Sequence, residues 1–289
     1  MKKICFYHCD DFDGRCAAAI VKNFEPEVEL IPFNYNNKFN FFKVTKEQTI
    51  YFVDISLPVN QMLELNKICD NFIYIDHHIS KLENLNLKDF KGIQDSTTAA
   101  CILTWKYFNK DLNNLPKAVQ LIGRYDIFDL DEEVLAFQNG LYIYEEELVN
   151  ELKKRNELSL WKSLFNNDDN LLQKIKSEGT IIKKFVDFRN KKECNNNANE
   201  IKFKGYTALI INSNKFTSTL FKHHKKYKEV DLLIIFCRTK NSWKFSIYTT
   251  KDNIDVSTIC KSYGGGGHKK AAGFFCNTIP DDFKKLNYF

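Results

Sequence analysis

Residues 72–80 read Phe-Ile-Tyr-Ile-Asp-His-His-Ile-Ser, and the interpretation of the whole chain starts from them. The first four residues are apolar and typical of a buried β-strand, which ends at Asp76, His77 and His78. In open α/β sheets, ligands bind at the carboxyl edge of the strands. One carboxylate and two imidazoles at such an edge indicate a metal or phosphate site. The alternative is an ordinary polar turn after a strand.

The length of 289 residues is sufficient for two domains. A hydrophobic content of 44% with 25 Phe predicts well-buried globular cores. No apolar run reaches the roughly 18 residues of a membrane span. The N-terminal Met-Lys-Lys leads directly into a short strand-like run, whereas a signal peptide needs a longer apolar region. We therefore expect a cytoplasmic protein that does not contact a membrane.

The cysteines and the net charge narrow the class of protein only slightly. Nine Cys are scattered without any Cys-x-x-Cys spacing, so we expect reduced, buried thiols. The net charge of +5 suits a polyanionic ligand but does not require one.

The first strand-like run leads into a loop rich in carboxylates. His8, Asp11 and Asp13 lie close together in this loop and precede Gly14, which we expect to let the backbone turn away into a helix. An acidic helix N-terminus explains one Asp through capping and the helix dipole. It does not explain several like charges beside a His, because these repel one another without cations between them. The loop therefore predicts a metal site.

A second strand-terminal carboxylate supports the same site. Thr49–Val53 is β-rich and ends at Asp54, and an amphipathic helical pattern follows over residues 59–69. Such an Asp alone is often a helix cap. Because Asp76 follows one strand-helix unit later, and parallel βαβ units bring strand ends to one edge, a shared site is favoured.

Together these motifs resemble the DHH phosphoesterase superfamily. The matching motifs are His8-x-x-Asp11-x-Asp13-Gly14, Asp54 and Asp76-His77-His78. Residues 264–273, Gly-Gly-Gly-Gly-His-Lys-Lys-Ala-Ala-Gly, resemble the signature of the DHH-associated substrate domain. The two signatures span nearly the whole chain. The branch that the chain resembles is that of the oligoribonucleases (nano-RNases) and cyclic-nucleotide phosphodiesterases.

The resemblance implies an α/β fold of two domains with the active site in the cleft between them. We place an N-terminal parallel-sheet DHH domain at residues 1–195 and a smaller C-terminal α/β substrate-binding domain at residues 196–289. The sequence is helical and charged from about residue 141, and this part is interpreted as a helical connector. Residues 191–200 have low complexity and are expected to form a surface loop.

The resemblance also implies a pair of Mn²⁺ ions, with Mg²⁺ as the alternative. His8, Asp11 and Asp54 would hold one ion, whereas Asp13, Asp54, His77 and a later Asp would hold the other. Asp54 would then bridge the two. Carboxylate and imidazole donors without thiolates suit these metals on chemical grounds as well.

Two of these assignments keep alternatives. The later Asp is assigned to Asp126, with Asp129 and Asp131 as nearby competitors. Many family members read His-x-Asp-x-Asp in the first loop, and this chain has one more residue there. Asp10 therefore stays an alternative to Asp11, although Asp11 keeps its register with the glycine that follows.

The remaining site residues are implied by the resemblance. His78 would face the phosphate, and Asp76 would either orient the imidazoles or stand close to the attacking water. The glycine run predicts a nest of backbone N–H groups that binds an anion, helped by the N-terminus of a following helix. The alternative is a flexible hinge. The implied substrate-binding residues are Gly265, Gly266, Gly267 and His268.

Tyr248 marks a departure from the family pattern, because related nano-RNases often carry Arg at this position. We interpret Tyr248 either as a stacking surface for a base or as a core residue. Arg238 is a candidate replacement for the missing charge. This departure bears on the identity of the substrate more than on the chemistry.

The expected function is a Mn-dependent phosphodiesterase and exonuclease that hydrolyses short single-stranded oligonucleotides to nucleoside monophosphates by a two-metal mechanism. The alternatives are a cyclic mono- or dinucleotide phosphodiesterase and a 3′-phosphoadenosine 5′-phosphate phosphatase. An alternative of another class is a non-catalytic nucleotide-binding module, whose hallmark would be the loss of metal ligands. The sequence leaves open the choice between RNA and DNA, the polarity of cleavage and the formation of a homodimer.

Overall fold

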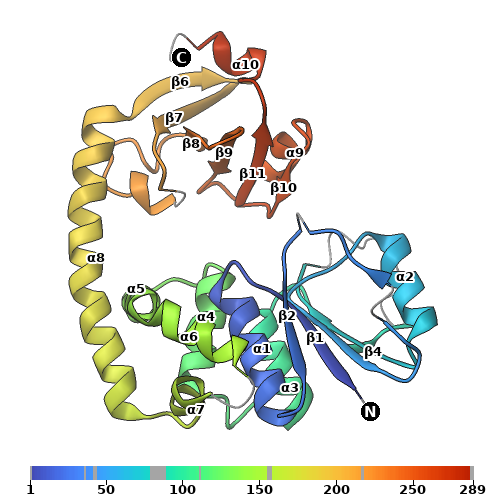
Figure 1. The fold of residues 1–289 in the computed structure, drawn as a ribbon. Coiled ribbons are helices and arrows are strands. Elements are labelled where there is room, and N and C mark those ends of the chain that lie inside the picture. Colours follow the sequence, from blue (N-terminus) through green and yellow to red (C-terminus); the bar gives the residue numbers. More distant parts are fainter. Residues whose placement is uncertain are drawn as a thin grey trace. The chain divides into compact units, whose positions relative to one another are not determined.

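The computed structural model describes residues 2–35, 37–41, 44–78, 89–110, 112–154, 158–215 and 218–286. The chain divides into two compact units, Met1–Lys183 and Lys184–Phe289 (Figure 1). The division falls within the long helix α8 (Asp169–Asn197), and the expected domain boundary at residue 195 falls within the same helix. That boundary stays a prediction. Ile79 and Ser80, which end the stretch quoted first, lie outside the described residues.

The first unit is built on a parallel sheet of five strands in the order β2-β1-β3-β4-β5. The strands are β1 (Lys3–His8), β2 (Glu29–Phe33), β3 (Thr49–Val53), β4 (Asn71–Asp76) and β5 (Lys91–Gln94). The predicted α/β class with a parallel N-terminal sheet is therefore confirmed. Strand β5 was not predicted, because its four residues, Lys-Gly-Ile-Gln, form no apolar run.

Helices cover both faces of this sheet (Figure 1). Alternate residues of the central strands enter two separate cores. Tyr51 and Val53 pack in the core that includes α1 (Phe12–Phe24) and α3 (Ala100–Asn109). Phe52 points to the opposite core, which includes α2 (Val59–Ile68). The sheet is thus wound on both sides, and the carboxyl ends of its strands share one edge.

The rest of the first unit is helical and extends the core beside α1 and α3. These elements are α4 (Lys117–Asp126), α5 (Glu132–Leu141), the 3₁₀ turn η4 (Tyr142–Tyr144), α6 (Glu145–Lys153), α7 (Ser159–Phe165) and the start of α8. Trp161 is fully buried here, and its indole Nε1 donates to the carbonyl of Leu148 at 3.0 Å. The helical character expected of this region is therefore observed.

Two glycines allow α5 and α8 to cross with their backbones in contact. A Cβ on Gly179 would lie 1.8 Å from the carbonyl oxygen of Ala136, and a Cβ on Gly140 would lie 2.0 Å from that of Ile175. Neither position can accept a side chain without moving a backbone segment. The crossing fixes α5 against α8, and α5 forms one wall of the pocket described below.

The second unit contains a mixed sheet of six strands in the order β10-β11-β9-β8-β7-β6, in which only β7 and β8 pair in parallel. The strands are β6 (Asn199–Phe203), β7 (Tyr206–Asn212), β8 (Leu232–Arg238), β9 (Trp243–Tyr248), β10 (Gly266–Gly267) and β11 (Ala271–Cys276). The helical elements are η5 (Ser218–Phe221), α9 (Val256–Lys261) and α10 (Asp281–Lys284).

Two expectations for local structure were wrong. Residues 191–200 do not form a surface loop, because α8 continues to Asn197 and β6 begins at Asn199. The polar composition concealed one anchor, since Cys194 is fully buried in the core of the second unit. The glycine run is also not followed by a helix. It enters β10, which pairs antiparallel with β11.

All nine cysteines are free, and six of them are buried as expected, whereas Cys9, Cys237 and Cys276 are only half-buried. Among the described helices, none combines the length and the apolar character that crossing a membrane requires.

Prediction for the helix crossing. Replacing Gly179 with Ala should lower the free energy of unfolding by about 1–3 kcal/mol, because the added methyl group overpacks the contact with α5. The higher helix propensity of Ala acts in the opposite direction by about 0.5–1 kcal/mol. Gln173→Ala is the control on an exposed position of the same helix. Equal chemical-denaturation midpoints for the two variants would contradict the close crossing.

Candidate metal centre

The carboxyl edge of the first sheet gathers every residue that the sequence assigned to metal binding. His8 ends β1, Asp54 follows β3, and His77 follows β4. Three overlapping groups have nitrogen and oxygen atoms within 4.8 Å of one another, and all their members belong to the first unit. The groups are His8, Asp11 and Asp54; Asp13, His77 and Asp126; and Asp54, Asp76, His77 and His78.

Asp54 lies at the centre of these groups. Its carboxylate is 1% exposed, and its oxygens lie 3.4 Å from His8 Nδ1, 3.3 Å from His77 Nε2 and 3.5 Å from His78 Nδ1. Among the described residues, no donor is in hydrogen-bonding geometry with either oxygen. Its backbone adopts a φ of +58°, which Asp tolerates better than most residues and which turns the chain sharply at the strand end. A buried carboxylate without hydrogen-bond donors destabilises the folded state unless a cation is near.

Asp13 is held in place from the opposite side of the site. It is 2% exposed, and its two oxygens accept the backbone N–H groups of Ala100 and Cys101, each at 2.8 Å. These are the first N–H groups of α3, whose own N-cap residue supplies no side-chain hydrogen bond. Asp13 therefore caps α3 from α1, and one of its oxygens lies 3.8 Å from His77 Nε2.

The structure distinguishes Asp126 from its two competitors. The Oδ2 atom of Asp126, at the end of α4, lies 3.2 Å from His77 Nε2. Asp129 and Asp131 instead pair with Arg124 at 2.7 and 2.8 Å, and Asp131 also caps α5 through the N–H of Val134. The carboxylates of Asp129 and Asp131 are thus engaged within the loop after α4 and at the start of α5.

Asp11 and Asp10 also have different surroundings. Asp11 is the N-cap of α1 and accepts the N–H of Gly14 at 3.0 Å through one oxygen. Its other oxygen lies 2.8 Å from His8 Nδ1. Asp10 is exposed, and its carboxylate accepts a hydrogen bond from Asn34. The geometry therefore favours Asp11 as the ligand.

Gly14 has a different role from the one expected. It lies inside the first turn of α1, and a Cβ at this position would lie 2.2 Å from the carbonyl oxygen of His8. The glycine is required because α1 packs directly on the end of β1, and not because the backbone turns away there.

Asp76 is fully buried, and its oxygens are surrounded by donors. Oδ1 accepts the backbone N–H groups of His77 and His78 at 2.7 and 3.0 Å and lies 3.0 Å from His78 Nδ1. Oδ2 accepts the hydroxyl of Tyr74 at 2.7 Å. Burial disfavours the charge, but these donors outweigh it and hold the pKa of Asp76 at about 2. Of the two roles expected for Asp76, the contacts favour orientation of the imidazoles.

The neighbouring groups perturb one another strongly. Burial, together with the charge of Asp54, raises the pKa of Asp13 to about 7. Burial and the charges of Asp13 and Asp54 raise the pKa of Asp126 well above its usual range. Burial opposes protonation of His77, yet the adjacent carboxylates of Asp54, Asp13 and Asp126 raise its pKa to about 10. Crowded carboxylates that resist ionisation, beside an Asp54 with no donor, fit a site for cations.

The predicted substrate residues lie in the second unit. Gly265, Gly266 and Gly267 run into the hairpin of β10 and β11, where His268 and Ala271 exchange backbone hydrogen bonds at 2.8 and 3.2 Å. The backbone there is thus engaged in a hairpin, which does not fit a flexible hinge.

Tyr248 and Arg238 differ in exposure. Tyr248 is 9% exposed and packs in the core, where burial raises its pKa to about 12. Arg238 is exposed at the end of β8, with its guanidinium 5.6 Å from the centre of the Trp243 ring. Of the two interpretations of Tyr248, the structure favours the core residue.

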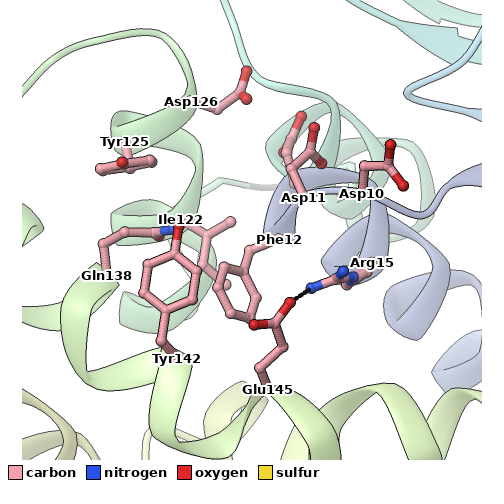
Figure 2. A pocket seen from close by; sticks show the side chains of 11 residues that line it. Asp10, Asp11, Phe12, Arg15, Ile122, Tyr125, Asp126, Gln138, Tyr142 and Glu145 are labelled. Atoms are coloured by element: carbon pink, nitrogen blue, oxygen red, sulfur yellow. Dashed lines mark hydrogen bonds and ion pairs between the residues drawn. The ribbon is translucent and has the colours of Figure 1, made fainter. Parts of the chain in front are cut away.

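A pocket of about 100 Å³ adjoins the candidate ligands (Figure 2). Sequence reasoning missed several residues that line it, among them Arg15, Gln138, Tyr142 and Glu145. Arg15 joins α1 to α6 through an ion pair with Glu145 at 2.6 Å and also donates to the carbonyl of Cys9 at 2.8 Å. The only available signal was the position of Arg15 directly after Gly14, since the other three residues come from distant helices.

Comparisons with known proteins agree with this architecture. No protein-family model matches the chain. The chain is 24% identical to Oligoribonuclease NrnB of Bacillus subtilis, over 92% of this chain and 71% of that protein. It is also 24% identical to an uncharacterised protein of Acanthamoeba polyphaga mimivirus, over 82% of this chain but only 55% of that protein. The chain thus spans little more than half of the viral relative.

Solved structures show the same fold. A DHH domain described as a member of the S1p family of ribosomal proteins matches with a TM-score of 0.57 and 11% identity, over 95% of this chain and 82% of that chain. The pGpG-specific phosphodiesterase PggH from Vibrio cholerae matches with a TM-score of 0.53 and 12% identity, over 99% and 96% of the two chains. The resemblance to the DHH phosphoesterases that the sequence predicts is confirmed.

Prediction for the first loop. Asp11→Asn should lower Mn²⁺ affinity about 10-fold or more, because a carboxylate ligand is lost. The fold should persist, because Asn is as good an N-cap residue as Asp. Asp10→Asn, the matched control, should leave the affinity unchanged. Titration calorimetry with Mn²⁺ measures both, and a larger loss for Asp10→Asn would reverse the assignment.

Proposed function

We propose that this protein, which resembles the DHH phosphoesterases of the NrnB branch, is a Mn²⁺-dependent phosphodiesterase that hydrolyses short single-stranded oligonucleotides to nucleoside monophosphates. The comparisons indicate a phosphoesterase. The name of the B. subtilis relative, an oligoribonuclease, supports the substrate class. PggH is a phosphodiesterase specific for pGpG, and this specificity supports a nucleotide substrate here.

The observation that carries the proposal is the buried Asp54 carboxylate between two groups of nitrogen and oxygen donors. We assign His8, Asp11 and Asp54 to one ion, and Asp13, Asp54, His77 and Asp126 to a second. Mg²⁺ is the alternative metal. When bound, such a pair supplies an activated hydroxide and stabilises charge on the phosphoryl oxygens. Because no predicted ligand is absent from the cluster, a non-catalytic nucleotide-binding module is disfavoured.

The protein groups around this centre serve to position one another. Asp76 is satisfied by donors on both oxygens, so we assign it a positioning role through His78. Its contact with Nδ1 fixes the direction of the His78 ring, and we propose that Nε2 faces the phosphate. Asp13 ties the site to α3, and Arg124 stabilises the loop after Asp126.

Several finer points stay predictions. These are the cytoplasmic location, the possible homodimer, the choice between RNA and DNA, and substrate binding by Gly265, Gly266, Gly267, His268, Tyr248 and Arg238.

Prediction for activity. With Mn²⁺, the protein should hydrolyse 5′-labelled RNA of two to about seven nucleotides, and a chelator should remove the activity. Asp54→Asn should lower kcat about 10³-fold or more, because it removes the charge shared by both groups of ligands. Asn tolerates the left-handed backbone of this position, so the variant should fold normally. Gel separation of the products gives both rate and polarity.

The same assay distinguishes the alternatives. The panel also contains DNA of the same lengths, cyclic mono- and dinucleotides, 3′-phosphoadenosine 5′-phosphate and pyrophosphate. Faster hydrolysis of a cyclic nucleotide would replace the substrate but keep the chemistry. Normal turnover by Asp54→Asn would refute the assignment of the metal centre. Metal binding without hydrolysis of any compound would favour the binding module.

A further inference from the structure

The pocket beside the metal centre has two kinds of lining residue. Asp11, Asp13 and Asp126 belong to the candidate metal ligands, whereas the rest of the wall has no metal-binding role. That wall includes Phe12, Arg15, Ile122, Tyr125, Gln138, Tyr142 and Glu145. A water molecule needs about 10–15 Å³ of such space. The volume of about 100 Å³ therefore has room for a group larger than water, next to the candidate metal ligands.

Gln138 contributes a buried amide to this wall. The residue is 5% exposed, and its Oε1 atom is buried without a hydrogen-bond partner among the described residues. Its side chain extends from α5 among the residues that line the pocket (Figure 2). The crossing of Gly140 with α8 holds α5 in place, so the amide cannot easily move out to solvent. Such an oxygen requires an N–H or O–H donor from a ligand or a water.

Two aromatic rings form a neighbouring part of the wall. Phe12 is buried, whereas Tyr142 is 53% exposed. Their ring centres are 5.4 Å apart with an interplanar angle of 62° (Figure 2). The exposed part of the Tyr142 ring offers a stacking face to a flat ligand.

The charges of the wall argue against a second phosphate. Arg15 is the only cationic residue among the eleven that line the pocket, and Glu145 pairs with it at 2.6 Å. The guanidinium is also fixed by the carbonyl of Cys9 and lies 5.5 Å from the centre of the Phe12 ring. Asp10 adds a further negative charge to the lining. A neutral ring with N–H donors is therefore favoured over an anion.

We propose that this pocket binds the nucleobase of the nucleotide whose phosphate lies at the metal centre. Gln138 turns its side-chain amide toward the pocket and accepts an N–H group from the edge of the base, and Tyr142 covers the face of the base. The inference rests on the proposed function and deepens it, because it makes Gln138 and Tyr142 specificity-determining residues. It separates nucleotide substrates from phosphate compounds without a base, such as pyrophosphate.

The test compares two ligands that differ only in the base, adenosine 5′-monophosphate and ribose 5-phosphate. Their affinities for the Mn²⁺-loaded full chain are measured by calorimetry. The wild type should bind the nucleotide at least about 10-fold more tightly, since the base adds a buried hydrogen bond and a stacking contact. Gln138→Leu should reduce this preference about 10-fold and leave the affinity for ribose 5-phosphate unchanged.

Two further variants make the result specific. Tyr142→Leu alters an exposed residue that should not disturb folding, and it should also reduce the preference for the nucleotide. Gln120→Leu makes the same chemical change as Gln138→Leu at an exposed position of α4 outside the pocket lining, and it should have no effect. Thermal unfolding of all variants identifies any loss that comes from misfolding.

A kinetic comparison separates this inference from the proposed function. The substrates are a ribodinucleotide and two analogues with an abasic ribose at the first or the second position. If the wild type hydrolyses none of them, the proposed function fails. If it hydrolyses all three equally well, or if Gln138→Leu and Tyr142→Leu weaken both calorimetric ligands equally, the base pocket is refuted. The base pocket is supported if the wild type has a higher KM for only one of the two abasic analogues than for the ribodinucleotide, and if the variants lose this difference in KM while they retain kcat. The position of that abasic ribose shows which nucleotide the pocket binds.

Discussion

The crowding of buried carboxylates around Asp54 is the constraint on which the first unit depends. Asp54 follows the end of β3 with a left-handed backbone conformation and is almost fully buried. Among the described residues, no donor is in hydrogen-bonding geometry with its carboxylate. Burial, together with nearby carboxylate charge that includes Asp54, raises the pKa values of Asp13 and Asp126. Buried carboxylates without neighbouring cations would destabilise the folded state. Bound cations reverse the sign of the effect, so metal binding and folding stability should be coupled in this unit.

The acidic residues of the edge differ in how many hydrogen-bond donors their carboxylate oxygens meet. Asp76 receives donors on both oxygens, Asp131 pairs with Arg124 and caps α5, and Asp10 accepts from Asn34. These carboxylates are satisfied by the protein and stabilise its loops and rings. Asp54 is not satisfied in this way, and Asp11 uses one oxygen as an N-cap while the other faces His8. Asp13 is the exception among the candidate ligands, because each of its oxygens accepts a backbone N–H group of α3.

Sequence patterns predicted the parts of the site that depend on local order. An apolar strand that ends in Asp or His leaves a signal within a few residues, so the positions of His8, Asp54 and His77 at the sheet edge followed from the sequence. The signal fails where distant segments decide the outcome. The composition of residues 191–200 indicates a loop, and only the tertiary structure shows that Cys194 is buried in a core. The requirement for Gly14 likewise follows from the packing of α1 against the end of β1.

The base pocket is the strongest example of this limit, because its parts carry no motif of their own. Arg15 and Glu145 are 130 residues apart and meet only because α1 and α6 pack together. The sequence around Gln138 gives no signal of a binding role. Its amide is buried in the wall of the pocket because α5 crosses α8 at close range. All the lining residues belong to the first unit, which also carries the candidate ligands. Chemistry and recognition of the base would then share one rigid frame, in which a substrate is held at its phosphate and its base at once.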